Sequence, residues 1–209
     1  SGRLPDVVYH EFGHALHHHS LIPGAGDFDA AMSEGVSDYL AATTVGDAGI
    51  GRGFIRGADA PLRDLDPSGG EYYWPLNISP DPHETGLIIA GALWDLRDAM
   101  IARYGATAGK QRADDLYYAT LERAADIPTT YPEVLAADDD DGNLANGTPN
   151  RCLIDAAFGP HGLVDGDSTF GIDRPTRDGF AVSLATTAVG GCAAPRSEEH
   201  TSELQSQFR

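Results

Sequence analysis

Two histidines and a glutamate near the start of the chain have a spacing that can bind a metal ion. The sequence of residues 10–14 is His-Glu-Phe-Gly-His, so His10 and His14 lie one helical turn apart and can point from one face toward a single ion. Glu11 lies beside them, where a carboxylate can take a proton from an attacking water and pass it to a leaving amine. We therefore predict His10 and His14 as zinc ligands and Glu11 as a catalytic carboxylate.

A catalytic zinc ion needs three protein ligands and one open position, so a third ligand must come from elsewhere. His18 continues the row of His10 and His14, but eight helical residues separate His18 from His10 by ~12 Å, too far to share an ion. Glu34 is the better candidate, because it lies twenty residues after His14 on a second predicted helix. Asp38, one turn further, is placed to accept the free ring N–H of a ligand histidine. The alternative for both carboxylates is an ordinary solvated helix face.

Hydrophobic periodicity predicts the elements that position these residues. Helices are expected at 5–20, from a cap at Asp27 or Asp29 to about 44, and at 85–104, 110–125, 131–137 and 153–158. In the first helix, we expect the apolar stripe of Val8, Phe12, Ala15 and Leu16 to pack in the protein centre. We expect His17, His18 and His19 to form a solvated helix end. We expect residues 46–84 to form a long irregular connection and residues 180–189 to form a strand.

Composition limits the classes of partner. The chain has 32 acidic and 14 basic residues, a formal charge of -18, which argues against nucleic acid and anionic membrane surfaces. No apolar run approaches the ~20 residues that span a bilayer. Cys152 and Cys192 predict either one disulfide or two unpaired thiols. Residues 196–206 resemble a translated sequencing adapter, so 196–209 are expected to carry no fold information.

An acidic loop is a second candidate metal site. Four consecutive aspartates offer the oxygen ligands that calcium prefers: Asp138, Asp139, Asp140 and Asp141. Aligning Gly142 with the glycine of an EF-hand places Ala137 at the first ligand position and Thr148 where the closing glutamate belongs, so the loop is not an EF-hand. It is either another kind of calcium site or a solvated acidic turn.

The two-part zinc motif, with Glu34 and Asp38 following His-Glu-x-x-His, resembles the thermolysin-like gluzincin peptidases. The sequence of residues 33–38 and 136–163 is similar to that of the fungalysin-like secreted peptidases. The resemblance covers most of residues 5–165. It implies a mainly α fold, in which residues 1–165 form the helical catalytic subdomain of a zincin with long irregular loops. A β-rich N-terminal subdomain would then be missing, and residues 166–195 would be a linker or a strand.

The resemblance also implies an activity. It implies a secreted, bacterial extracellular zinc metalloendopeptidase that hydrolyses protein or peptide substrates, and a fragment without the β-rich subdomain would cleave poorly. Enzymes of this kind stabilise the oxyanion with a histidine and a tyrosine. His83 is the candidate histidine, with a helix-capping loop histidine as the alternative. No tyrosine lies between His14 and Glu34, which leaves Tyr72 and Tyr73 as candidates for the other role.

Two further hypotheses stay open. One is a noncatalytic zinc-binding or degenerate peptidase domain used for binding. The presence of Glu11 argues against it, because a structural zinc site needs no base and fills its fourth position with protein. The other is an aminopeptidase with the same zinc chemistry, which would need acidic groups that fix a free N-terminus, and the sequence does not locate such groups.

Overall fold

Helices dominate the computed structural model, which describes residues 4–56 and 58–164. Within these residues the elements follow one another as α1 Pro5–Ser20, α2 Ala30–Val45, β1 Gly49–Ile50, β2 Arg63–Asp64, α3 Pro82–Tyr104, α4 Ala106–Arg123, α5 Thr130–Asp138, the 3-10 helix η1 Leu144–Asn146, α6 Arg151–Phe158 and the 3-10 helix η2 Gly159–His161. The predicted mainly α class is therefore confirmed. The irregular connection between the second and third helices is also present, although it contains the two short strands.

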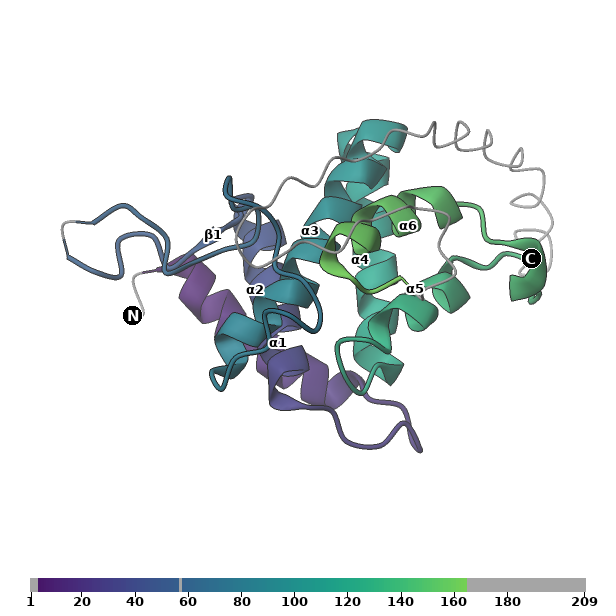
Figure 1. Cartoon of the computed structure of the whole chain (residues 1–209), viewed down its shortest axis with the longest axis horizontal. Helices are drawn as coiled ribbons and strands as arrows, with labels where there is room; N and C mark the ends of the chain where they lie inside the picture. The colour runs from purple at the N-terminus through teal and green to yellow at the C-terminus, as the bar shows by residue number, and fades with distance from the viewer. Residues whose placement is uncertain (1–3, 57, 165–209) are drawn as a thin grey trace, which may run out of the picture.

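Helix α3 lies at the centre of the molecule. It contacts α2 on one side and α4 and α6 on the other, while α1 packs on α2 (Figure 1). Its buried side chains point in several directions around its axis, as expected for a helix surrounded by others. The largest fully buried ones are Ile88, Ile89, Leu93, Leu96 and Met100. Helix α3 therefore supports α2, and α2 in turn supports α1.

Two glycines let α2 and α3 approach closely. A Cβ atom on Gly35 would overlap the carbonyl oxygen of Gly86, and one on Gly86 would lie 2.7 Å from the Gly35 nitrogen. Close backbone approach of this kind requires residues without side chains. Because Gly35 follows Glu34 and Gly86 lies one turn after His83, the contact brings the start of α3 to the carboxylate of Glu34.

Side chains fix where α2 and α3 begin. The Asp29 carboxylate accepts a hydrogen bond from the Met32 nitrogen, so the cap predicted at Asp27 or Asp29 is Asp29. The Asp81 carboxylate accepts one from the His83 nitrogen, and Pro82 occupies the first helical position. Helix α3 thus starts at Pro82 rather than at Thr85, and His83 lies in its first turn instead of in the preceding loop.

The connection between α2 and α3 is attached to both neighbouring helices. Strand β1 pairs with β2 in antiparallel register, with Gly49 opposite Asp64 and Ile50 opposite Arg63. The Asp6 carboxylate on α1 accepts a hydrogen bond from the Gly51 nitrogen, which ties the turn after β1 to the first helix. This attachment holds Arg63 beside α1 and α2.

The orientation of α1 differs from the prediction. Val8 is 51% exposed and Phe12 is 58% exposed, whereas the buried face carries the mostly polar residues Asp6, His10, Gly13, His17 and Ser20. His17, expected at a solvated helix end, is completely buried, and its ring stacks on Phe28 with 3.9 Å between centroids. The predictions were wrong for Val8, Phe12 and His17, because the face of α1 with the histidines and Gly13 packs on α2. Leu16 of the stripe does pack against the core, and His18 and His19 are exposed as expected.

Several predictions lie outside the described residues. These are the strand at 180–189, the extension at 166–195, the adapter-derived segment at 196–209, and Cys192, so the disulfide between Cys152 and Cys192 stays a prediction. Within the described residues, none of the helices has the length and apolar character needed to cross a membrane.

Candidate metal centre

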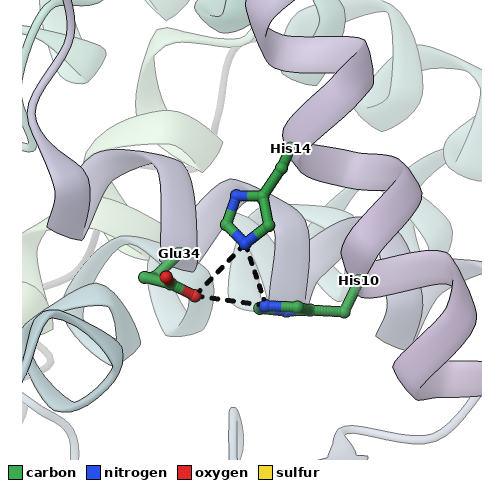
Figure 2. Close-up of side chains that lie close together, drawn as sticks. All are labelled: His10, His14 and Glu34. Carbon is green, nitrogen blue, oxygen red and sulfur yellow. Dashed lines mark hydrogen bonds and ion pairs between the residues drawn. The ribbon is translucent and has the colours of Figure 1, made fainter.

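Three predicted ligands converge at one point between α1 and α2 (Figure 2). The Nε2 atoms of His10 and His14 lie 3.1 Å apart. The Oε2 atom of Glu34 lies 3.1 Å from Nε2 of His10 and 3.5 Å from Nε2 of His14. We call these three atoms the ligand triad. His10 and His14 share one face of α1, and Glu34 reaches them from the first half of α2, as the sequence predicted.

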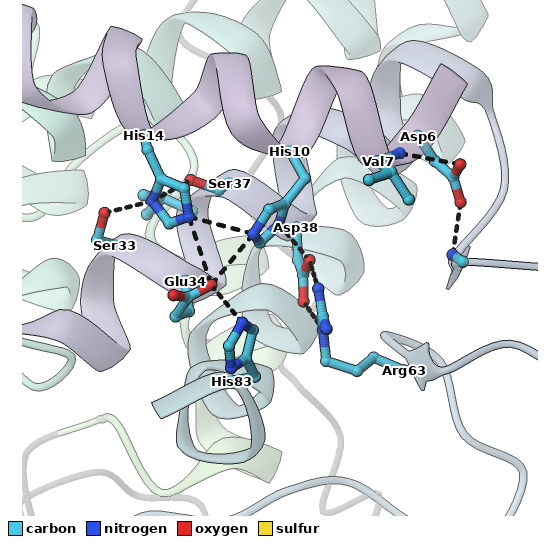
Figure 3. Close-up of polar contacts among 12 residues, drawn as sticks. Asp6, Val7, His10, His14, Ser33, Glu34, Ser37, Asp38, Arg63 and His83 are labelled. Atoms are coloured by element: carbon cyan, nitrogen blue, oxygen red, sulfur yellow. Dashed lines mark hydrogen bonds and ion pairs between the residues drawn. The ribbon is translucent and has the colours of Figure 1, made fainter. Parts of the chain in front are cut away.

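His10 is held by a carboxylate behind its ring (Figure 3). Its Nδ1 lies 2.7 Å from Oδ1 of the completely buried Asp38. Arg63 donates two hydrogen bonds to the same carboxylate, from Nε at 2.6 Å and from Nη2 at 2.7 Å. The predicted role of Asp38 agrees with this contact, whereas Arg63 was missed. Because Asp38 contacts Nδ1 of His10, the Nε2 atom of His10 is directed toward the other two ligand atoms.

His14 is held by hydroxyl groups instead. Its Nδ1 lies 2.8 Å from Oγ of Ser33 and 3.2 Å from Oγ of Ser37 (Figure 3). Sequence reasoning missed both serines, although a signal was present: each directly precedes one of the two predicted carboxylates, so the pair repeats at the same four-residue spacing. The two imidazoles thus have different outer partners.

The electrostatics of the cluster favour positive charge beside the carboxylates. Burial opposes protonation of His10, but Asp38 and Glu34 outweigh it and raise the pKa of His10 to about 9. Burial also opposes ionisation of Glu34, yet His10 and His14 hold its pKa well below the usual value. The pKa of Asp38 is lowered against burial by Arg63 and His10. Both carboxylates therefore stay ionised near neutral pH.

The triad fits a divalent metal ion. Zinc binds histidine nitrogen and carboxylate oxygen at ~2.0–2.2 Å in tetrahedral geometry, which separates its ligand atoms by about 3.3 Å. The three distances in the triad lie close to that value. Oε2 of Glu34 is buried, and despite its nitrogen neighbours it has no well-directed hydrogen-bond partner in the described part of the chain. A cation at the centre of the triad would give this buried oxygen a partner.

His83 approaches the site from α3. Its Nε2 lies 3.2 Å from Oε2 of Glu34 (Figure 3). Its Nδ1 lies 2.9 Å from Oδ1 of Asp81. The described residues whose ligand atoms all lie within 4.8 Å of one another at this site are His10, His14 and Glu34, without His83. His83 therefore lies beside the triad, as predicted, but is not a member of the ligand group.

The other candidate residues have different placements. Glu11 is exposed on α1, next to His10. The Tyr72 carbonyl lies 3.0 Å from Nδ1 of His161, and the ring of Tyr73 lies against Gly162. The contacts of both tyrosines thus place them beside η2, and their predicted oxyanion role gains no support from the structure.

The acidic loop divides into two parts. Asp138 accepts hydrogen bonds from the backbone and side-chain nitrogens of Asn150, both at 2.6 Å, so it joins the end of α5 to the start of α6. Carboxylate oxygens of Asp139, Asp140 and Asp141 lie within 4.8 Å of one another. Calcium binding at this loop stays a prediction, because exposed acidic groups are common without an ion.

No model of a protein family matches the chain, and no curated protein matches it significantly.

Proposed function

We propose that this chain is the helical catalytic part of a zinc-dependent metallopeptidase, with His10, His14 and Glu34 as metal ligands. The observation that carries the proposal is the ligand triad, in which three atoms of the types that zinc prefers converge from two helices. The contact of Nδ1 with Asp38 supports it, because ligand histidines commonly donate their second N–H to such a group.

Each residue of the site has a separate role in this proposal. Zinc bound at the triad supplies a Lewis acid for peptide hydrolysis. The carboxylate of Glu11 takes a proton from the attacking water and delivers it to the leaving nitrogen. His83 donates from Nε2 to the negative oxygen that develops on the peptide carbonyl, while Asp81 fixes its ring through Nδ1.

The geometry favours a catalytic over a purely structural zinc site. A structural site surrounds zinc with four protein ligands, whereas a catalytic site leaves one position open. In the described part of the chain the ligand group has three members, and His83 lies beside it rather than within it. Glu11 is exposed and can therefore meet a substrate. These features argue against the noncatalytic zinc-binding domain.

The proposal includes membership of the gluzincin peptidases and peptide or protein substrates. Its support is the order of the motif, in which Glu34 and Asp38 follow the two histidines and occupy the ligand and outer positions. A β-rich subdomain that completes the substrate site, and secretion, belong to the same proposal. The pair of exposed apolar residues Val8 and Phe12 beside Glu11 is compatible with contact to such a subdomain.

A Glu11→Gln variant of the full chain tests the proposal. Wild type and variant are dialysed, their zinc content is measured by elemental analysis, and hydrolysis of an unfolded protein is followed at high enzyme concentration. We expect about one zinc per chain in both proteins and loss of hydrolysis in the variant only, because the substitution removes the base without removing a ligand. Glu34→Ala is the matched variant that should lose zinc. Absence of zinc from wild type, or unchanged hydrolysis by Glu11→Gln, would contradict the proposal.

A further inference from the structure

The two ligand histidines differ in the groups that hold them. His10 contacts the Asp38 carboxylate, whose two hydrogen bonds from Arg63 fix its position. The Nδ1 atom of His14 instead faces two serine hydroxyls, Ser33 at 2.8 Å and Ser37 at 3.2 Å. Both serines are buried, with 7% and 0% of their surface exposed, so water does not readily replace them.

The chemistry of metal binding requires an acceptor at this place. A neutral imidazole that binds a metal through Nε2 carries its proton on Nδ1, and that proton needs a hydrogen-bond acceptor when the ring is partly buried. A hydroxyl oxygen can accept such a bond. The two serines lie one helical turn apart on α2, on either side of Glu34 in the sequence, so they can reach the same nitrogen.

Gly13 explains how α2 comes close enough to His14. A Cβ atom on Gly13 would lie 2.7 Å from Cα and 2.8 Å from Oγ of Ser37. The first of these neighbours is backbone, so a side chain at Gly13 would push the two helices apart instead of moving one flexible group. The glycine directly before His14 therefore permits the contact between Ser37 and the His14 ring.

We propose that Ser33 and Ser37 together are the positioning residues of His14, accepting its Nδ1–H so that Nε2 faces the metal, and that Gly13 admits Ser37 to this position. The inference rests on the proposed zinc site and deepens it. It assigns the serines a role in metal affinity and ligand orientation, acting through His14.

The test compares Ser33→Ala, Ser37→Ala and the double variant with wild type in the full chain. The zinc dissociation constant is measured by competition with a chromophoric chelator, and the visible spectrum is recorded with Co²⁺ in place of zinc. Loss of an outer partner typically weakens metal binding ~10–100-fold, so we expect a loss of this size in the double variant and smaller losses in the single ones. The Co²⁺ spectrum should change, because the His14 ring turns.

Ser20→Ala is the matched control. Ser20 is also buried, with 8% exposed, and its hydroxyl donates to the Leu16 carbonyl at the far end of α1, away from the triad. Its loss should leave zinc affinity and the Co²⁺ spectrum unchanged, which separates positioning from general destabilisation. Ser33→Thr keeps a hydroxyl and should restore affinity to near the wild-type value. Gly13→Ala should weaken zinc binding at least as much as Ser37→Ala. If the Gly13→Ala variant fails to fold, the serine variants still test the proposal.

The outcomes separate this inference from the proposed function. One zinc per wild-type chain with an unchanged dissociation constant in the double serine variant would overturn the role of the serines and leave the metal site intact. A wild-type chain that binds no zinc would overturn both. A loss of affinity equally large in Ser20→Ala would overturn the positioning role alone.

Discussion

His10 on α1 and His161 in η2 are both buried imidazoles beside two carboxylates, yet their surroundings differ. Nε2 of His10 meets a second imidazole and Glu34 at 3.1 Å each. Nε2 of His161 lies 3.3 Å from Oδ2 of Asp95 and 3.8 Å from Oε2 of Glu71. The ligand atoms around His10 form a group within 4.8 Å of one another, whereas those around His161 do not belong to any such group in the described residues.

The second cluster joins three segments. His161 comes from η2, Asp95 from α3 and Glu71 from the connection before α3, while Nδ1 of His161 faces the carbonyl of Tyr72. A Cβ atom on Gly91 of α3 would lie 2.6 Å from Cε1 of His161, so the ring fits only against a glycine. We call this cluster the His161 clamp.

The difference shows that an oxygen partner at Nδ1 does not by itself bring candidate ligand atoms into one compact group. Both rings have an oxygen acceptor at Nδ1, at 2.7 Å from Asp38 for His10 and at 3.0 Å from Tyr72 for His161. What distinguishes the first cluster is a second imidazole one helical turn away and a carboxylate that points at both. The His161 clamp lacks a second imidazole in the described residues, and its two carboxylates approach a single ring from two segments.

The largest expected effect separates the two clusters through their carboxylates. In Asp38→Asn, Arg63 loses its ionised partner in a buried site, and breaking such a pair typically costs ~3–5 kcal/mol. Asp95→Asn is the matched change in the His161 clamp, where the side chain is 31% exposed, and it should cost at most ~1 kcal/mol. Urea denaturation of the metal-free chain at pH 7 measures both. Equal losses of unfolding free energy would mean that the Asp95–His161 pair contributes as much as the Asp38–Arg63 pair.

A third buried imidazole sharpens the comparison, because it has neither kind of partner. Both ring nitrogens of His17 are buried, and neither has a hydrogen-bond partner among the described residues. Burial, with the charges of His14 and His18, lowers the pKa of His17 to about 4. The folded-state value lies below the usual 6.5, so the neutral ring contributes stability above pH 6.5 that is lost as pH falls toward 4. The full loss is on the order of 3 kcal/mol.

His17→Leu should remove this loss. Thermal unfolding followed from pH 7 to pH 4 is expected to show a smaller drop in stability for the variant than for wild type, because leucine takes no proton. His19→Leu, in the same last turn but at an exposed position, is the matched control and should follow wild type. Parallel pH profiles for wild type and His17→Leu would show that His17 is protonated in the fold without cost.

The local part of the site was predictable from the sequence. Helical spacing placed His10 and His14 on one face, and the interval to Glu34 and Asp38 matched the return of a second helix, so the structure brings all four together. These are properties of two helices and of the connection between them, residues 21–29. His83 was also a candidate, because the resemblance to the gluzincins implies an oxyanion histidine, and the structure places it beside Glu34.

Long-range contacts were not predictable in the same way. Arg63 lies in an irregular connection, twenty-five residues after its partner Asp38, and nothing in the local pattern marks it. The outward turn of Phe12 and the burial of His17 follow from the close contact at Gly13, which periodicity does not register because it counts apolar side chains. A glycine beside metal ligands was the available signal that this face of α1 packs on another helix.

The smallest expected effect tests the His161 clamp by its pH dependence. Burial, with the charges of Asp95, Asp66 and Asp64 opposed by His161, raises the pKa of Glu71 to about 7. The folded-state value lies above the usual 4.5, so this group contributes stability below pH 4.5 that is lost as pH rises through 7. Glu71→Gln should therefore match wild type at pH 4 and exceed it at pH 8, by up to ~1 kcal/mol after screening by solvent. Urea midpoints of both proteins at the two pH values measure the difference. A variant less stable than wild type at pH 8 would show that ionised Glu71 pairs favourably with His161, and the clamp would then resemble the metal cluster in depending on charged carboxylates.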